Sequence, residues 1–215
     1  MKTLTIHFTE DFDVNGLGDA KAWEKAEAAP LTVADGASTV TTTARMLYSE
    51  KGLYILFDCE AHKLYAPENR DFAELYNQDV AEVFLQPDGD VPLYLEYEMC
   101  PLGAELPLMV INRGAGFHGW LPFHYEGERR IRHAAHVWGG ERRDGAACER
   151  WTAECFIPFA LFEGAIQGMP KRGEHWRGNF YRIEYEEQAV TLLNYAPITG
   201  ATFHEPKAFA ELVFE

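Results

Sequence analysis

The chain has 215 residues, of which 47% are hydrophobic and 25% are charged, a composition typical of globular proteins and not of disordered or fibrous ones. Asp and Glu number 34 against 19 Lys and Arg, which gives a formal net charge of -15. Because this charge repels nucleic-acid phosphates and anionic lipid headgroups, we expect no nucleic acid and no membrane among the partners. The length predicts a single domain over residues 1–215 with a full hydrophobic core.

Strand-forming patterns, either alternating or rich in β-branched and aromatic residues, recur along the whole chain. They predict strands at 3–8, 40–48, 53–59, 80–85, 93–99, 106–111, 131–138, 151–157, 179–185, 190–195 and 208–214. Turn-forming residues at 50–52, 87–90 and 139–140 favour hairpins between them. Only 20–29 and 158–164 have helical patterns. We therefore predict an all-β fold, a single antiparallel β-sandwich of immunoglobulin or jelly-roll type with one or two short helices.

The N-terminal stretch alternates polar and apolar residues and lacks the long apolar segment of a secretory signal. We therefore expect a cytoplasmic protein, whereas a chain whose signal peptide had been removed would be extracellular. The four cysteines lie on or beside apolar segments, at Cys59, Cys100, Cys148 and Cys155. Without CxxC spacing, buried free thiols are favoured over disulfides.

Four sequence segments, in a fixed order, carry a resemblance to a known family. They are 52–57 (GLYILF), 75–85 (LYNQDVAEVFL), 151–158 (WTAECFIP), and 176–182 (WRGNFYR) together with 203–209 (FHEPKAF). In this order they resemble family 9 carbohydrate-binding modules and the wider DOMON-like β-sandwiches. The resemblance implies a non-catalytic domain that holds the end of a mono- or oligosaccharide between aromatic side chains, with calcium supporting loops in some members.

The resemblance also points to individual ligand-binding residues. Tyr76 and Tyr195 fall where the family carries its two sandwiching aromatic residues, which are tryptophan in the better-known members. A tyrosine ring still offers a flat apolar face to a sugar, with less contact area. Glu82 falls at the family's acidic position, where an ionised carboxylate would accept strong hydrogen bonds from sugar hydroxyls. A structural role for Glu82 is equally open, because along a strand it shares a face with Val80 and Phe84.

Further candidates come from neighbouring segments. Glu96 and Glu98 stand on a strand where some sugar-binding members place a basic residue and an amide, so the preferred ligand is expected to differ. Asn112 and Arg113 lie at the end of the following strand. Trp120 lies in the glycine-rich segment GFHGW, which predicts an exposed loop that could contact a ligand.

No cofactor is required by this interpretation, and calcium is the metal to consider. The candidate ligands are Asp79, Asp88 and Asp90, because calcium prefers several hard oxygen donors. Aspartate is also a common turn residue, and for these three positions the turn role is favoured.

Three other functions remain open, and we expect no enzyme activity. A protein-interaction or scaffold module with a decayed sugar site, and hence a protein partner, would explain the tyrosines at the tryptophan positions. A glycoside hydrolase would need two carboxylates about 5 to 10 Å apart, and no organised catalytic motif is present. A haem-binding DOMON-like domain would use Met and His ligands without a CxxCH attachment motif. The residues available for that role are Met99, Met109, His118 and His124.

Overall fold

Strands are the main regular secondary structure of the computed structural model, which describes residues 1–33, 38–113, 117–123, 125–164, 168–186, 189–200 and 202–215. The strands in these residues are β1 (Thr3–Phe8), β2 (Ala29–Pro30), β3 (Thr32–Val33), β4 (Thr42–Tyr48), β5 (Gly52–Glu60), β6 (Val80–Gln86), β7 (Leu93–Met99), β8 (Glu105–Asn112), β9 (Phe117–Pro122), β10 (Arg132–Trp138), β11 (Arg150–Pro158), β12 (His175–Glu186), β13 (Ala189–Asn194) and β14 (Ala210–Phe214). The helices in these residues are short 3-10 turns, η1 (Lys21–Lys25), η2 (Leu75–Asn77), η3 (Gly127–Arg129), η4 (Phe159–Phe162) and η5 (Pro206–Ala208). None of the described helices has the length and apolarity needed to cross a membrane.

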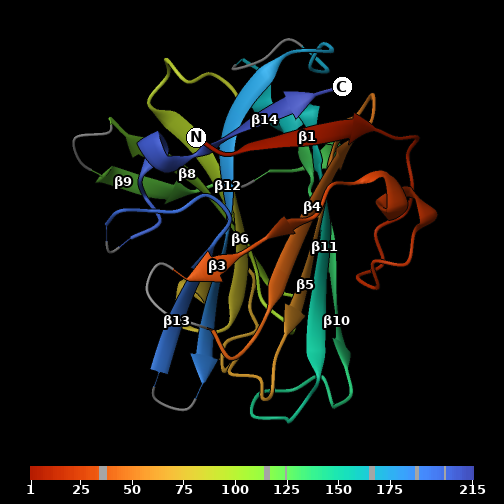
Figure 1. Cartoon of the computed structure of the whole chain (residues 1–215), viewed down its shortest axis with the longest axis vertical. Helices are drawn as coiled ribbons and strands as arrows, with labels where there is room; N and C mark the ends of the chain where they lie inside the picture. Colours follow the sequence, from red (N-terminus) through yellow and green to blue (C-terminus); the bar gives the residue numbers. More distant parts are fainter. Residues whose placement is uncertain (34–37, 114–116, 124, 165–167, 187–188, 201) are drawn as a thin grey trace.

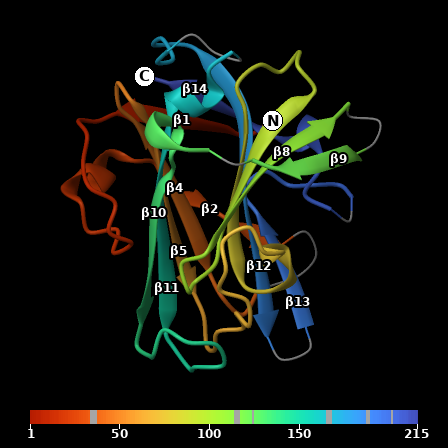
Figure 2. The same ribbon diagram turned by 180° about the vertical axis from the view of Figure 1, so that it is seen from behind.

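The strands form one continuous, curled, mixed sheet (Figures 1 and 2). Its main path runs β10-β11-β5-β4-β1-β14-β12-β6-β7-β8-β9, with β13 added to β12, β2 to β4 and β3 to β13. Strand β1 pairs in parallel with both β14 and β4 and so joins the two halves of the sheet. The halves pack on each other, as the edge-to-face contact between Phe57 on β5 and Phe180 on β12 shows, with ring centroids 6.0 Å apart.

The all-β prediction and the eleven predicted strands are confirmed, but the antiparallel sandwich is not an adequate description. The two parallel pairings of β1 make the sheet mixed and continuous. The physical reason is that β1 supplies hydrogen bonds on both of its edges, to β14 near Leu4 and to β4 near Phe8. Two separate sheets would leave those edges unpaired.

Two local predictions also need correction. The predicted helix at 20–29 is helical only over η1, because the backbone is extended at Ala20 and again at Ala26. The segment around Trp120 is strand β9, paired with β8, and not a loop. Gly119, with φ of 139°, and a register shift between Ile111 and Asn112 allow this glycine-rich segment to pair with β8. The four cysteines are buried and free, as predicted.

Side-chain alternation gives the sheet two buried faces. On β6, Ala81, Val83 and Leu85 belong to the main core between the two halves. Val80 and Phe84 belong to a second hydrophobic cluster on the opposite face, which also contains residues of β7, β8 and β12. Because residues two apart share a face of a strand, Glu82 lies on the second face, outside the main core. This second face carries the candidate site.

Candidate functional site

A pocket of about 370 Å³ opens on the second face of the sheet. Its lining combines aromatic rings, aliphatic side chains and two glutamates, namely Tyr76, Glu82, Phe84, Glu96, Leu108, Trp120, Ile183, Leu192, Thr202, Phe203 and His204. Tyr76 from η2, Glu82 from β6 and Trp120 from β9 are all sequence-predicted binding residues. The fold therefore brings Trp120 into one pocket with Tyr76 and Glu82, which lie close to each other in the sequence.

Two aromatic side chains line the pocket from different elements, Tyr76 from η2 and Trp120 from β9. Tyr76 is half-buried, and Trp120, which lies opposite Val110 on the edge hairpin, is 37% exposed. Burial raises the pKa of Tyr76 to about 12, so its hydroxyl stays protonated at neutral pH and can donate a hydrogen bond. Both side chains can offer a flat apolar face together with a polar edge.

Glutamates on β6 and β7 form a buried cluster beneath these rings. Glu82 on β6 lies directly opposite Glu98 on β7, and Glu96 lies two residues from Glu98 on the same face. The exposed fractions of the three residues are 2% for Glu82, 4% for Glu96 and 0% for Glu98. Glu82 and Glu96 line the pocket, whereas Glu98 is enclosed beside them.

Burial favours the protonated form of each glutamate in the cluster. It raises the pKa of Glu96 to about 8. Burial, together with repulsion from Glu96, also raises the pKa of Glu82 well above its usual range, and burial with repulsion from Glu82 and Glu96 raises the pKa of Glu98. Among the described residues, Glu96 and Glu98 hydrogen-bond with each other, and Oε2 of Glu96 and both oxygens of Glu98 have no other hydrogen-bond partner.

His204 closes one side of the pocket and is held there by its neighbours. Its Nδ1 lies 2.7 Å from the hydroxyl of Tyr94 and 3.9 Å from Oε2 of Glu96. Burial lowers the pKa of His204 to about 4, so the ring is neutral at neutral pH. Asn112, a sequence-predicted binding residue, donates from Nδ2 to the carbonyl of His204 at 2.9 Å and so supports the pocket wall. Arg113 is exposed at the end of β8 and is not part of the described lining.

Tyr195, predicted as the second sandwiching residue, lies elsewhere. It is buried in the main core, where its ring packs edge-on against Phe180 with centroids 6.0 Å apart. Its hydroxyl donates to the carbonyl of Thr3 at 2.9 Å, and the Lys2 ammonium lies 4.5 Å from the ring centroid. Tyr195 thus fastens β1 to the core. Trp120, and not Tyr195, lines the pocket together with Tyr76.

Phe203 and His204 line the pocket but were assigned no role from the sequence. Both lie in the segment 203–209, which carries part of the family resemblance. Phe203 stacks on Tyr181, with ring centroids 4.1 Å apart and an interplanar angle of 14°. Their position in this segment is the sequence feature that could have indicated a role for them in the site.

The three aspartates considered for calcium do not fit a metal site. Asp79 uses both carboxylate oxygens to accept backbone N–H groups, from Tyr65 and from Tyr185, each at 2.8 Å. Asp88 accepts the backbone N–H of Asp90 at 2.9 Å within the exposed turn between β6 and β7. Across the described ranges, no group of three or more His, Cys, Asp or Glu side chains is placed to hold a metal ion. These aspartates therefore organise the backbone.

We predict that Asp79→Ala lowers the free energy of unfolding by about 2 to 4 kcal/mol, because the buried N–H groups of Tyr65 and Tyr185 lose their acceptors. Urea unfolding with calcium and with a chelator should give the same loss. Asp88→Ala, at an exposed turn, serves as the control and should have a small effect. A loss that appears only with calcium present would contradict the structural role of Asp79.

The residues considered for haem give no site in the described structure. Met99 is buried in the main core. His124 lies outside the described residues, and so does the side chain of His118.

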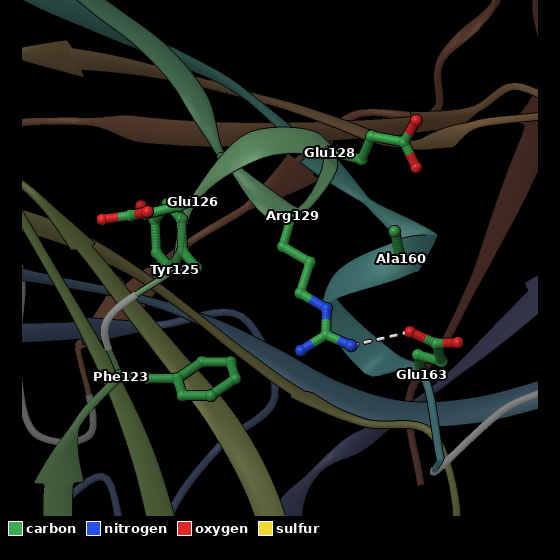
Figure 3. A pocket seen from close by; sticks show the side chains of 7 residues that line it. All are labelled: Phe123, Tyr125, Glu126, Glu128, Arg129, Ala160 and Glu163. Atoms are coloured by element: carbon green, nitrogen blue, oxygen red, sulfur yellow. Dashed lines mark hydrogen bonds and ion pairs between the residues drawn. The ribbon is translucent and has the colours of Figure 1, made fainter.

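A second hollow, of about 690 Å³, lies beside η3 and η4 and is shown in Figure 3. Its lining is Phe123, Tyr125, Glu126, Glu128, Arg129, Ala160 and Glu163. The ion pair across it joins Arg129 and Glu163 at 2.7 Å, with side chains 53% and 71% exposed. Charges that water already solvates give little binding energy, so the pocket at Tyr76 is the stronger candidate.

The fold and the pocket at Tyr76 define an all-β binding domain whose site combines aromatic rings with a few convergent polar groups. Residues 14–100 match the family described as carbohydrate family 9 binding domain-like. Over this segment the chain is therefore similar to family 9 carbohydrate-binding modules.

Three solved structures resemble the whole chain. One is described as a "putative carbohydrate-binding protein" from Bacteroides uniformis, with a TM-score of 0.80, 19% identity, and coverage of 100% of this chain and 99% of that one. Two show a family 9 carbohydrate-binding module from Caldicellulosiruptor kristjanssonii. Its glucose complex has a TM-score of 0.70, 14% identity, and coverage of 100% of this chain and 96% of that one. Its cellotriose complex has a TM-score of 0.69, 14% identity, and coverage of 100% of this chain and 94% of that one. At these identities the likeness concerns the fold. No curated protein sequence matches the chain.

Proposed function

We propose that the pocket between Tyr76 and Trp120 binds a mono- or oligosaccharide and catalyses no reaction on it. The observation that carries this proposal is the convergence of Tyr76, Trp120 and Glu82, from three separate elements, on one pocket. The glucose and cellotriose complexes of a module with the same fold support a sugar as the ligand class.

The pocket supplies the two kinds of contact that a sugar needs. The rings of Tyr76 and Trp120 can cover the apolar C–H face of a pyranose. Glu82, Thr202 and His204 can exchange hydrogen bonds with its hydroxyls. The volume, about 370 Å³, falls in the range of small-molecule sites.

The protonation of the pocket supports binding without hydrolysis. Glycoside hydrolysis requires one protonated and one ionised carboxyl across the scissile bond. The two glutamates that line the pocket, Glu82 and Glu96, both have a pKa raised by burial. Burial therefore disfavours the ionised form that a nucleophile or a general base needs. A decayed site would be expected to be filled by its own side chains, and this pocket is open.

We expect isothermal titration against a panel of mono- and oligosaccharides, glucose and cellotriose included, to give saturable heat. Tyr76→Ala and Trp120→Ala should each weaken binding about fivefold or more, because each removes one aromatic wall worth about 1 kcal/mol beyond burial. Phe8→Ala is the matched control, since Phe8 is 37% exposed like Trp120 and lies outside the pocket lining. Equal weakening by all three variants, or no heat with any sugar, would contradict the proposal.

A further inference from the structure

The pocket contains acidic groups without a basic partner. None of its described lining residues is lysine or arginine. His204 is the basic side chain nearest to Glu96, and burial lowers the pKa of His204 to about 4, so it carries no charge at neutral pH. Buried carboxyls are normally paired with a cation or satisfied by hydrogen bonds. Here Glu82, Glu96 and Glu98 lie together without a cation.

Unsatisfied oxygens at the pocket floor point to a ligand that donates hydrogen bonds. Oε2 of Glu96, a residue that lines the pocket and is 4% exposed, receives no hydrogen bond from any described residue apart from Glu98. The oxygens of Glu98 likewise have no described hydrogen-bond partner other than the carboxyl of Glu96. A buried polar atom without a partner is costly, so a ligand that reaches Glu96 would recover that cost on binding.

The chemistry of the pocket selects among possible donors. A sugar hydroxyl can give one hydrogen bond to a carboxyl oxygen, but it carries no charge. An ammonium group has three donors, and its hydrogen bonds to an ionised carboxylate are about twice as strong as neutral ones. The faces of Tyr76 and Trp120 also attract a cation held within about 6 Å of a ring centroid.

We infer that the pocket prefers an amino sugar, whose ammonium group is held by Glu96 and Glu82 while Tyr76 and Trp120 cover the ring. This inference rests on the proposed sugar-binding function and specifies its ligand class.

Binding of an ammonium group is coupled to proton release. Burial raises the pKa of Glu96 to about 8, so the free pocket holds this carboxyl protonated at neutral pH. An ammonium beside it favours the ionised form, and the displaced proton passes to the solvent. The described titratable groups around Glu96 are Glu82, Tyr94, Glu98, Tyr76, Tyr181 and His204. Burial favours the neutral form of each of these groups in the free pocket.

The test compares glucosamine with glucose and N-acetylglucosamine, which keep the ring but lack the charge. In isothermal titration at neutral pH, glucosamine should bind at least about tenfold more tightly than either, as expected for an added charge-assisted contact. The heat should vary with the ionisation enthalpy of the buffer and indicate release of up to about one proton per glucosamine, with none for glucose. Glu96→Gln keeps the size of the side chain and cannot ionise, so it should reduce the glucosamine-to-glucose affinity ratio to about one. Glu50→Gln, at an exposed turn outside the pocket, is the matched control and should leave the ratio unchanged.

The outcomes separate this inference from the proposed function. Glucose binding as tightly as glucosamine, with both weakened by Tyr76→Ala, would overturn the amino-sugar preference and leave sugar binding in place. An unchanged affinity ratio in folded Glu96→Gln would overturn it as well, and Glu82→Gln provides a second variant should Glu96→Gln not fold. Absence of binding by all three sugars would overturn the amino-sugar preference, whereas the proposed function would be contradicted only if the oligosaccharides of the panel gave no heat either.

Discussion

The free energy of unfolding should decrease as the pH rises from about 5 to about 8, with Glu96 contributing up to about 1.4 kcal/mol per pH unit and Glu82 and Glu98 acting in the same direction. In the unfolded chain a glutamate titrates near a pKa of about 4.3. In the folded protein the pKa of Glu96 is about 8, and the pKa values of Glu82 and Glu98 are also well above their usual range.

The direction in which the free energy of unfolding changes with pH follows from which state, folded or unfolded, binds more protons. Between the unfolded and the folded pKa, the folded state keeps the proton on Glu96 and the unfolded state does not. The stabilisation from this group is therefore full below about pH 4.3 and is lost as the pH rises to about 8. Asp79, whose pKa burial raises to about 7, adds to the slope in the same direction.

Urea unfolding at intervals between about pH 5 and about pH 8 measures the slope directly. Glu96→Gln should lower this slope by the contribution of up to about one proton, and Glu98→Gln should do the same, because glutamine cannot ionise. Above about pH 7 both variants should be more stable than the natural chain, since they remove a buried group that must otherwise ionise or hold a proton. Glu50→Gln, which is exposed, should leave the slope unchanged. Stability that is flat over this range in the natural chain would contradict the burial of the cluster.

The second large effect is expected at Glu105 on β8, which is fully buried. Its Oε2 accepts the hydroxyls of Tyr97 at 2.7 Å and Tyr125 at 2.6 Å and lies 3.2 Å from Nδ1 of His133, while Oε1 lies 3.1 Å from Arg130. Burial acts to raise the pKa of Glu105, but the hydrogen bond and charge of His133 hold it below its usual value. This carboxylate is therefore an ionised centre that joins β7, β8 and β10.

Glu105→Ala should lower the free energy of unfolding by about 3 to 5 kcal/mol, because several buried partners lose their common acceptor. Glu105→Gln keeps an acceptor and should cost less. Tyr125→Phe, which removes one hydroxyl, is the matched control and should cost about 1 kcal/mol. Urea unfolding near neutral pH distinguishes these values. A loss for Glu105→Ala no larger than that for Tyr125→Phe would show that the cluster does not act as a unit.

The strands could be predicted because their evidence is local. Each alternating or β-rich run is visible within the run itself, and all eleven predicted runs are strands. Strand β9 was missed because glycine disfavours an extended strand, and only pairing with β8 overrides that preference. The parallel pair of β1 with β14 depends on residues almost a whole chain length apart, so no local pattern indicates it.

The site was predictable in part for a similar reason. Tyr76 and Glu82 fall in one resembling segment, and both line the pocket. Tyr195 shows the limit of matching by position, since its ring belongs to the main core. The pairing of Glu82 with Glu98 depends on the register between β6 and β7, which the sequence does not reveal.

The position of β1 has a consequence for how the chain folds. This strand precedes the other described strands along the chain, yet Thr3 lies opposite Glu211 on β14. The two halves of the sheet cannot be joined until β14 is available. Long-range pairing of this kind carries a high loop-closure cost and gives slow folding. Until β14 arrives, the open side of β1 is an unpaired edge that can accept a strand from another copy, so incomplete chains should be the species most prone to aggregate.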